Sequence, residues 1–178
     1  MRCLFTGLMV LVAILVAGVA LIYLLTDADT RVERSIVIAA PAEAIFPKLN
    51  SLKESETWSP WKEEDPKMEI TYEGPESGVG ALSRWESATQ GTGSQTILES
   101  VPPSKLVTAL DFGSMGTATA DFTLSPEAEG GTKVTWGMVS HGGNNLGFRA
   151  FNLALDKLVG PMFEKGLSNL KATVEAPE

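Results

Sequence analysis

The chain has 178 residues and a formal net charge of −8 at pH 7, from 14 Lys and Arg against 22 Asp and Glu. This length allows one domain with a sizeable core, together with an appendage. The acidic balance argues against general nucleic-acid binding, because contacts to phosphate need clustered basic side chains. Cys3 is the only cysteine, which excludes an intramolecular disulfide and a CxxC metal site.

Residues 4–25 form an apolar segment without any charge, LFTGLMVLVAILVAGVALIYLL. A helix of this length spans a hydrocarbon core of about 30 Å with a slight tilt. A cleaved signal peptide is the alternative, but its apolar region is normally about 7–15 residues long. Cleavage after Ala20 would also leave LIYLL on the mature chain. We therefore expect residues 1–25 to be a transmembrane anchor, followed by a polar linker at 26–30.

The charges beside this segment predict its orientation. The α-amino group and Arg2 favour a cytoplasmic N-terminus, so the domain at 31–178 is expected on the non-cytoplasmic side of a single-pass protein. Arg31 and Arg34 follow the segment closely and weaken this bias. Without residues 1–25 the chain keeps 13 basic and 22 acidic residues, a net charge of −9. Such a domain is not expected to lie flat on anionic lipid.

Alternating apolar residues begin after the linker. Residues 31–39 predict a first strand whose covered face carries Val32, Arg34, Ile36 and Ile38. Pro41 is suited to the first turn of a helix over Ala42–Asn50. Residues 51–62 are too broken for a long helix, and we expect a short helix and a turn that pack Trp58 and Trp61 against the domain.

Six further strands are predicted where alternating runs are separated by Gly, Pro and Ser. They cover residues 67–73, 80–88, 93–101, 106–112, 116–125 and 132–140. Clean alternation of apolar and polar residues is typical of antiparallel strands with one face covered and one face in water.

The C-terminal residues 144–174 predict one long helix with an apolar stripe. The stripe comprises Phe148, Phe151, Leu155, Val159, Met162, Phe163, Gly166 and Leu170. The opposite side carries Arg149, Asp156, Lys157, Glu164 and Lys171. Asn144 or Asn145 could cap the start, and Pro161 predicts a kink near Gly160. Antiparallel strands with helices on one face predict an α+β fold.

Five segments of the chain resemble the SRPBCC superfamily, in the expected order. They are ERSIVIAAPAEAIFPKLN at 33–50, WSPW at 58–61, YEGPESGVGALSRWES at 72–87, GTKVTWGM at 131–138 and FEKGLSNLK at 163–171. This superfamily has the helix-grip fold of START lipid-transfer domains, Bet v 1-like proteins and polyketide cyclases. Within it, the chain is most similar to the polyketide cyclase/dehydrase and lipid-transport group.

The resemblance implies a curved antiparallel sheet of about seven strands around the C-terminal helix, with a hydrophobic cavity between them. It implies no particular reaction, since members include carriers and enzymes. Together with the two-residue period of strands, it predicts which side chains line the cavity. The predicted ligand-binding set is Tyr72, Ser83, Trp85, Gln95, Phe112, Trp136, Met138, Phe151 and Leu155.

A mostly apolar lining with a few polar atoms is typical of small-molecule sites. The same set would also form an ordinary packed core. With Ser83 and Trp85 inward, Arg84 points into solvent. A register shifted by one residue would instead make Arg84 a buried anion clamp.

Catalytic and metal-binding residues are scarce. His141 is the only histidine and lies in residues 140–144, which we expect to be a solvated loop. One histidine without an available cysteine disfavours a metal site, and no cofactor is expected. No GxSxG-type turn is present to position a catalytic serine.

We therefore predict a membrane-anchored protein that binds or transfers a hydrophobic small molecule or lipid, without binding nucleic acid. The first alternative is a cyclase or dehydrase that acts on a polyketide-like substrate through Tyr72, Ser83, Arg84 or Gln95. We place it second because no acid–base pair converges in the sequence. The second alternative is an interaction module with a filled core that acts through its acidic surface.

The uncharged segment 4–25 makes a testable prediction about cellular location. The full chain should stay in the membrane fraction after high-salt and carbonate washing, because an inserted helix is held by hydrophobic burial rather than by charge. Mass spectrometry of the recovered protein should find Met1 and Arg2 retained. Release into the soluble fraction, or a mature N-terminus near Leu21, would contradict the anchor.

Overall fold

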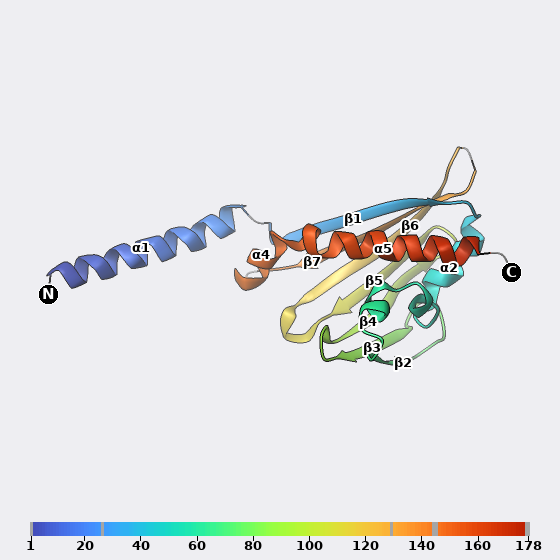
Figure 1. Ribbon diagram of the computed structural model, residues 1–178, viewed down its shortest axis with the longest axis horizontal. Coiled ribbons are helices and arrows are strands. Elements are labelled where there is room, and N and C mark those ends of the chain that lie inside the picture. Colours follow the sequence, from blue (N-terminus) through green and yellow to red (C-terminus); the bar gives the residue numbers. More distant parts are fainter. Residues whose placement is uncertain (1, 26, 129, 144–145, 177–178) are drawn as a thin grey trace.

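The computed structural model describes residues 2–25, 27–128, 130–143 and 146–176. A long helix, α1 (Arg2–Leu25), projects from one end of a domain in which helices lie on one side of a curved sheet (Figure 1). Thr6–Leu25 has a mean hydropathy of 3.0, and its most apolar part is 0% buried. An apolar helix at this place in the chain could be a membrane anchor or a signal sequence.

The sheet has seven antiparallel strands in the order β1-β7-β6-β5-β4-β3-β2. The strands are β1 (Asp29–Ile38), β2 (Glu69–Glu73), β3 (Leu82–Ser87), β4 (Gly91–Val101), β5 (Lys105–Asp111), β6 (Thr117–Pro126) and β7 (Thr132–His141). Each end lies within two residues of its predicted position. The α+β, helix-grip prediction is therefore confirmed.

Short helices connect or flank the strands. They are α2 (Ala42–Asn50), η1 (Glu54–Thr57), α3 (Pro60–Glu64), η2 (Gly113–Met115) and α4 (Leu146–Asn152). The longest helix of the domain, α5 (Leu155–Glu175), runs alongside β1, whereas β5, β4, β3 and β2 curve away below it (Figure 1). One half of the inner face of the sheet is thus closely covered by α5.

The prediction of one continuous C-terminal helix is wrong. The chain turns at Leu153 and Ala154, where the amide of Ala154 donates to the carbonyl of Phe151 over 2.9 Å. Tertiary contacts explain the break. Asn152 ends α4 and accepts a hydrogen bond from Ser140 on β7 (3.0 Å), whereas Asp156, in the first turn of α5, accepts from Arg34 on β1 (2.8 Å).

The helix α5 continues through Pro161, so the interruption lies seven residues earlier than the predicted kink at Gly160 and Pro161. Gly160 has a different role, since a Cβ there would lie 2.1 Å from Nη2 of Arg34. The proposed capping residues, Asn144 and Asn145, lie outside the described residues.

Two residues of the predicted helix face the other way. Arg149, expected in solvent, is only 9% exposed. Its Nε donates to the carbonyl of Gly143 (2.8 Å), and its guanidinium lies 4.7 Å from the ring centroid of Tyr23. Phe151, expected in the apolar stripe, is 44% exposed. Both corrections follow from the break, because α4 packs beside α1 instead of along the sheet.

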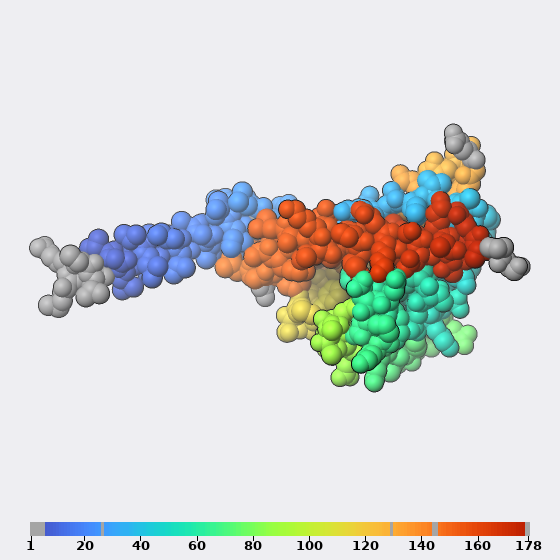
Figure 2. Space-filling model, in the orientation of Figure 1, coloured from blue at the N-terminus to red at the C-terminus, as the bar shows by residue number. Residues whose placement is uncertain are grey.

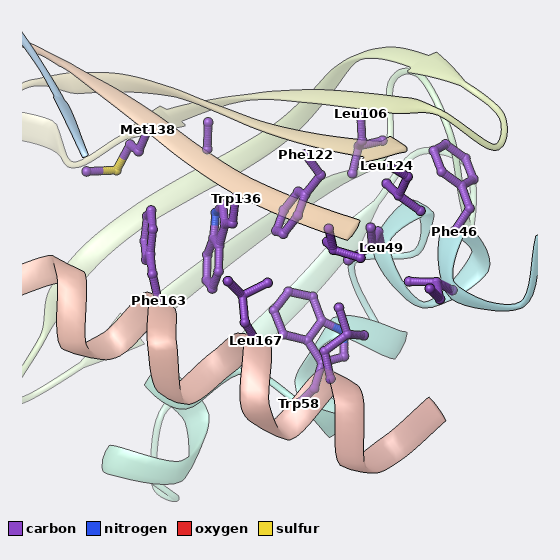
Figure 3. Close-up of a cluster of buried hydrophobic side chains, with 14 of the residues drawn as sticks. Phe46, Leu49, Trp58, Leu106, Phe122, Leu124, Trp136, Met138, Phe163 and Leu167 are labelled. Atoms are coloured by element: carbon purple, nitrogen blue, oxygen red, sulfur yellow. The ribbon is translucent and has the colours of Figure 1, made fainter. Parts of the chain in front are cut away.

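Trp136 on β7 stands at the centre of the aromatic core (Figure 3). Its indole stacks on Phe163 of α5 with ring centroids 4.0 Å apart and on Phe122 of β6 at 5.0 Å. Trp58 meets the Trp136 ring edge-on at 5.6 Å. Gly166 permits this close approach, since a Cβ there would lie 2.8 Å from the Trp136 ring.

Arg34 fixes the same helix to β1 by charge. Its guanidinium donates to Glu164 (2.7 Å) and Asp156 (2.8 Å). The hydrogen bonds to these carboxylates raise the pKa of Arg34, and the Arg34 hydrogen bond lowers the pKa of Asp156. The stabilisation through Asp156 is therefore complete above the ordinary aspartate pKa and is lost as the pH falls through the lowered value.

Truncation of the aromatic stack tests this description of the core. Phe163→Ala should lower the free energy of unfolding by about 3–5 kcal/mol, because a buried ring is lost beside Trp136. Leu98→Ala is the matched control, since Leu98 is 53% exposed on β4, and should cost less than about 0.5 kcal/mol. Urea unfolding of the full chain in detergent measures both, and equal losses would contradict the proposed core.

Candidate functional site

The antiparallel register brings polar residues of the inner face into one row across the sheet. Cross-strand partners follow one another in the order Tyr72, Ser83, Gln95, Leu110, Ala118 and Ser140. Trp85, two residues beyond Ser83, pairs with Gly93. Two neighbouring strands, β3 and β4, therefore place Ser83, Trp85 and Gln95 together.

Trp85 is held flat against β4 by the absence of a side chain opposite it. A Cβ on Gly93 would lie 2.2 Å from Cζ2 of Trp85. The indole meets Phe112, just beyond β5, in an edge-on contact with ring centroids 5.8 Å apart. Both rings are half-buried rather than covered. They form the apolar part of the candidate site.

Gln95 and Ser83 provide polar atoms beside these rings. The Gln95 amide nitrogen donates to Thr108 Oγ1 over 3.1 Å. Thr108 is 1% exposed and Ser83 is 7% exposed, so both hydroxyl groups are fixed within the sheet. This arrangement orients the Gln95 side chain along the inner face.

The remaining predicted residues occupy other surroundings. Trp136, Met138 and Leu155 are 8%, 8% and 2% exposed and belong to the packed core. Tyr72 is 38% exposed at the edge of the sheet, where its hydroxyl donates to Glu56. Burial and the Glu56 hydrogen bond raise the pKa of Tyr72, so the phenol is protonated at neutral pH.

The open end of the inner face is bounded by α4 and η2. The contact between these two elements was not predicted from the sequence. The Phe148 ring of α4 lies against Gly116, where a Cβ would be 2.7 Å from it. The ring centroids of Phe148 and Phe151 are 6.0 Å apart. In the space-filling view, the surface is hollowed beneath the start of α5, between the yellow and green segments (Figure 2). Gly116 has a φ of 102°, and no pattern in the sequence predicted this backbone conformation.

Two buried donors among the described residues have no hydrogen-bond partner, Trp136 Nε1 and Asn152 Nδ2. Asn152 is 5% exposed and accepts from Ser140 through its other amide atom. A buried donor without a partner costs about 1–3 kcal/mol. A lone Asn within an apolar stretch of helix is the sequence signal that could have predicted this buried donor.

Two pockets lie away from these residues. One of about 390 Å³ lies on the outer face, among Ser94, Thr96, Asp111, Thr119 and His141. Another of about 670 Å³ lies between the start of α2 and the β6–β7 turn. None of the nine predicted site residues lines either pocket.

His141 ends β7 and is not in a loop, which corrects the sequence expectation. Its Nδ1 lies 3.3 Å from Asp29, and its Nε2 lies 2.9 Å from Thr119 Oγ1. These three groups lie on adjacent strands of a continuous sheet whose register is unbroken there. If Thr119 were a nucleophile activated by His141 and Asp29, free backbone amides would be needed to stabilise an oxyanion. The backbone beside Thr119 is paired within the sheet, so it leaves no amide groups for this role.

Two further candidates, an anion clamp at Arg84 and a metal site, are not formed by the described residues. Arg84 is exposed and donates to Glu73 over 3.0 Å, so the outward register is confirmed and Arg84 forms no buried anion clamp. Within the part of the chain that the structure describes, no three His, Cys, Asp or Glu residues come together as a metal site.

A seven-stranded antiparallel sheet around a C-terminal helix defines the helix-grip class. Within that class, residues 29–175 match the family described as polyketide cyclase/dehydrase and lipid transport. The match covers most of the chain, and the protein belongs to this family. The fold is one that binds hydrophobic ligands. No curated protein matches the sequence.

Solved structures of similar fold are remote in sequence. A protein from Chromobacterium violaceum is 17% identical, with a TM-score of 0.57. The match covers 83% of this chain and 99% of the Chromobacterium chain. Ara h 8.0201 is 11% identical, with a TM-score of 0.60 and coverage of 82% and 97%. The di-domain ARO/CYC StfQ from the steffimycin biosynthetic pathway is 14% identical, with a TM-score of 0.61 and coverage of 83% and 51%. These likenesses establish the fold.

The half-buried state of Trp85 is testable by fluorescence quenching. Acrylamide should reach Trp85 more readily than Trp58, which is 4% exposed. The quenchable share of the emission should therefore fall in Trp85→Phe and rise in Trp58→Phe, because the second variant removes a covered emitter. If the quenchable share changes equally in both variants, Trp85 is covered and the candidate site is closed.

Proposed function

We propose that this protein binds a hydrophobic small molecule or lipid between its sheet and its C-terminal helices, while α1 anchors it in a membrane. The observation that carries the proposal is the half-buried pair of Trp85 and Phe112 on the inner face. Equivalent positions on β6 and β7 are covered by the stack of Trp136 and Phe163. The open half is the place where an apolar ligand replaces water.

Affinity can be bounded from the exposed apolar surface. Burial of about 300 Å² at about 25 cal/mol per Å² offers roughly 7 kcal/mol before ordering costs. Micromolar binding requires about 8 kcal/mol, so apolar contact alone gives a weak ligand. Gln95 supplies a polar contact, because its nitrogen is held by Thr108 and its carbonyl oxygen can accept from a ligand hydroxyl.

The side chains of the inner-face row favour binding over catalysis. The row from Tyr72 to Ser140 carries hydroxyl and amide groups, without a carboxylate, lysine or histidine. General acid–base catalysis requires a group that titrates near the working pH within hydrogen-bond reach of the reacting atoms, and the pKa of Tyr72, the titratable member of the row, is raised away from that range. Membrane anchoring would keep such a binding protein beside a store of apolar ligands.

A cyclase or dehydrase is the second candidate. The family name and the fold shared with an ARO/CYC protein support it. Tyr72 is the residue of the row that would donate a proton to a polyketide carbonyl, although its raised pKa beside Glu56 makes it a weak acid for this step. Ser83 and Gln95, from neighbouring strands, would orient that substrate.

Mass spectrometry of molecules extracted from the purified full chain tests the binding role. The wild-type protein should carry an apolar compound. Trp85→Ala should carry at least several-fold less of it, because the central apolar contact is removed. Leu98→Ala, which changes an exposed residue of β4, should carry the wild-type amount. Equal loading of all three proteins, or loading of none, would contradict the proposal.

A Gln95→Leu variant separates the two candidate functions. In a binding protein it should change which ligand is preferred, with no chemical step to lose. If polyketide substrates still bound normally and only their turnover disappeared, the enzyme would be the correct assignment.

A further inference from the structure

Three exposed apolar side chains lie within eight residues at the junction of α4 and α5. Phe151, Leu153 and Leu158 are 44%, 60% and 54% exposed. We name them the junction patch. Apolar side chains grouped in this way mark surfaces that meet a partner or a membrane.

The contact between α4 and α1 fixes the depth of the junction patch. The Arg149 guanidinium on α4 lies 4.7 Å from the Tyr23 ring centroid. Tyr23 lies two residues before the end of α1 at Leu25, a rise of about 3 Å along the helix axis. Tyr and Arg side chains commonly lie at the level where a spanning helix leaves the hydrocarbon. Phe151 and Leu153, within four residues of Arg149, are thereby held near that level, and Leu158 follows in the first turn of α5.

We propose that the junction patch enters the outer part of the bilayer that α1 spans, so that the protein meets this membrane at two places. The inference rests on the membrane-anchored role proposed above. Apolar side chains of an interfacial segment lie about 5–10 Å into the boundary between headgroups and acyl chains. The turn at Leu153 and Ala154 directs Leu153 away from the domain, where it is 60% exposed.

This contact would give the ligand a path that avoids water. Phe151 adjoins Phe148, whose ring lies on Gly116 beside the η2 turn. Met115 in that turn is 51% exposed, and Phe112, which precedes the turn, contacts Trp85. Apolar side chains therefore continue from the junction patch to the open half of the inner face.

The proposed contact does not depend on attraction to anionic lipid. Asp156, which lies between Leu153 and Leu158 in the chain, is paired with Arg34. The domain as a whole is acidic, with 22 Asp and Glu in the chain, so anionic lipid would repel it. Neutral phosphatidylcholine is the membrane that isolates the apolar contribution.

Depth-dependent fluorescence quenching tests the proposal with the full chain. Leu153→Cys in a Cys3→Ser background carries a nitrobenzoxadiazole probe, and the protein is reconstituted in phosphatidylcholine vesicles. Nitroxide lipids should quench this probe, and a nitroxide near the headgroup should quench more than one deep in the acyl chain. Val37→Cys is the control, because Val37 is 44% exposed on β1 and lies about 26 Å along the strand from Asp29. The control probe should be quenched several-fold less.

Flotation of the same vesicles separates the two claims. If the protein floats and the probe at residue 153 is quenched no more than the probe at residue 37, the patch proposal is wrong and the anchor stands. If the protein fails to float, both are wrong. If the emission of the probe at residue 153 instead falls as the protein concentration rises, equally with and without nitroxide lipids, a second copy covers the patch and the proposal is also wrong. A probe at Leu158→Cys repeats the measurement at an independent position.

Discussion

The stack of Trp136 on Phe163 determines how the rest of the domain is arranged. Parallel rings with centroids 4.0 Å apart require the backbone of α5 to lie close to the sheet, which Gly166 makes possible. Arg34 fixes the same helix to β1 over Gly160, through Asp156 and Glu164. With α5 held at β1 and β7, it cannot also cover β3, β4 and β5, which curve away from it (Figure 1).

Division of the inner face into a closed half and an open half separates the packed core from the proposed binding site. The closed half contains the aromatic core, and the open half exposes part of Trp85 and Phe112 beside Gln95. Membership of the polyketide cyclase/dehydrase and lipid transport family agrees with a fold that binds hydrophobic ligands. The contact of α4 with α1 orients the open half relative to the proposed membrane.

The sequence predicted features that depend on local periodicity. Alternation fixed the strands to within two residues and gave the inward direction of Ser83, Trp85 and Gln95. It failed where distant contacts decide. The break between α4 and α5 depends on Ser140 and Arg34, which are remote from it in the chain. Burial of Arg149 depends on Tyr23, and the position of the open end depends on the contact of Phe148 with Gly116.

Photocrosslinking of a bound ligand tests the central claim most directly. A fatty acid with a diazirine group in its chain would be bound to the full-length protein and activated by light, and its adducts would be assigned by tandem mass spectrometry. Adducts should concentrate on Trp85, Gln95 and Phe112, with fewer on the aromatic core. Adducts concentrated on Ser94, Thr119 and His141, which line the outer-face pocket of about 390 Å³, would contradict a site between the sheet and its helices.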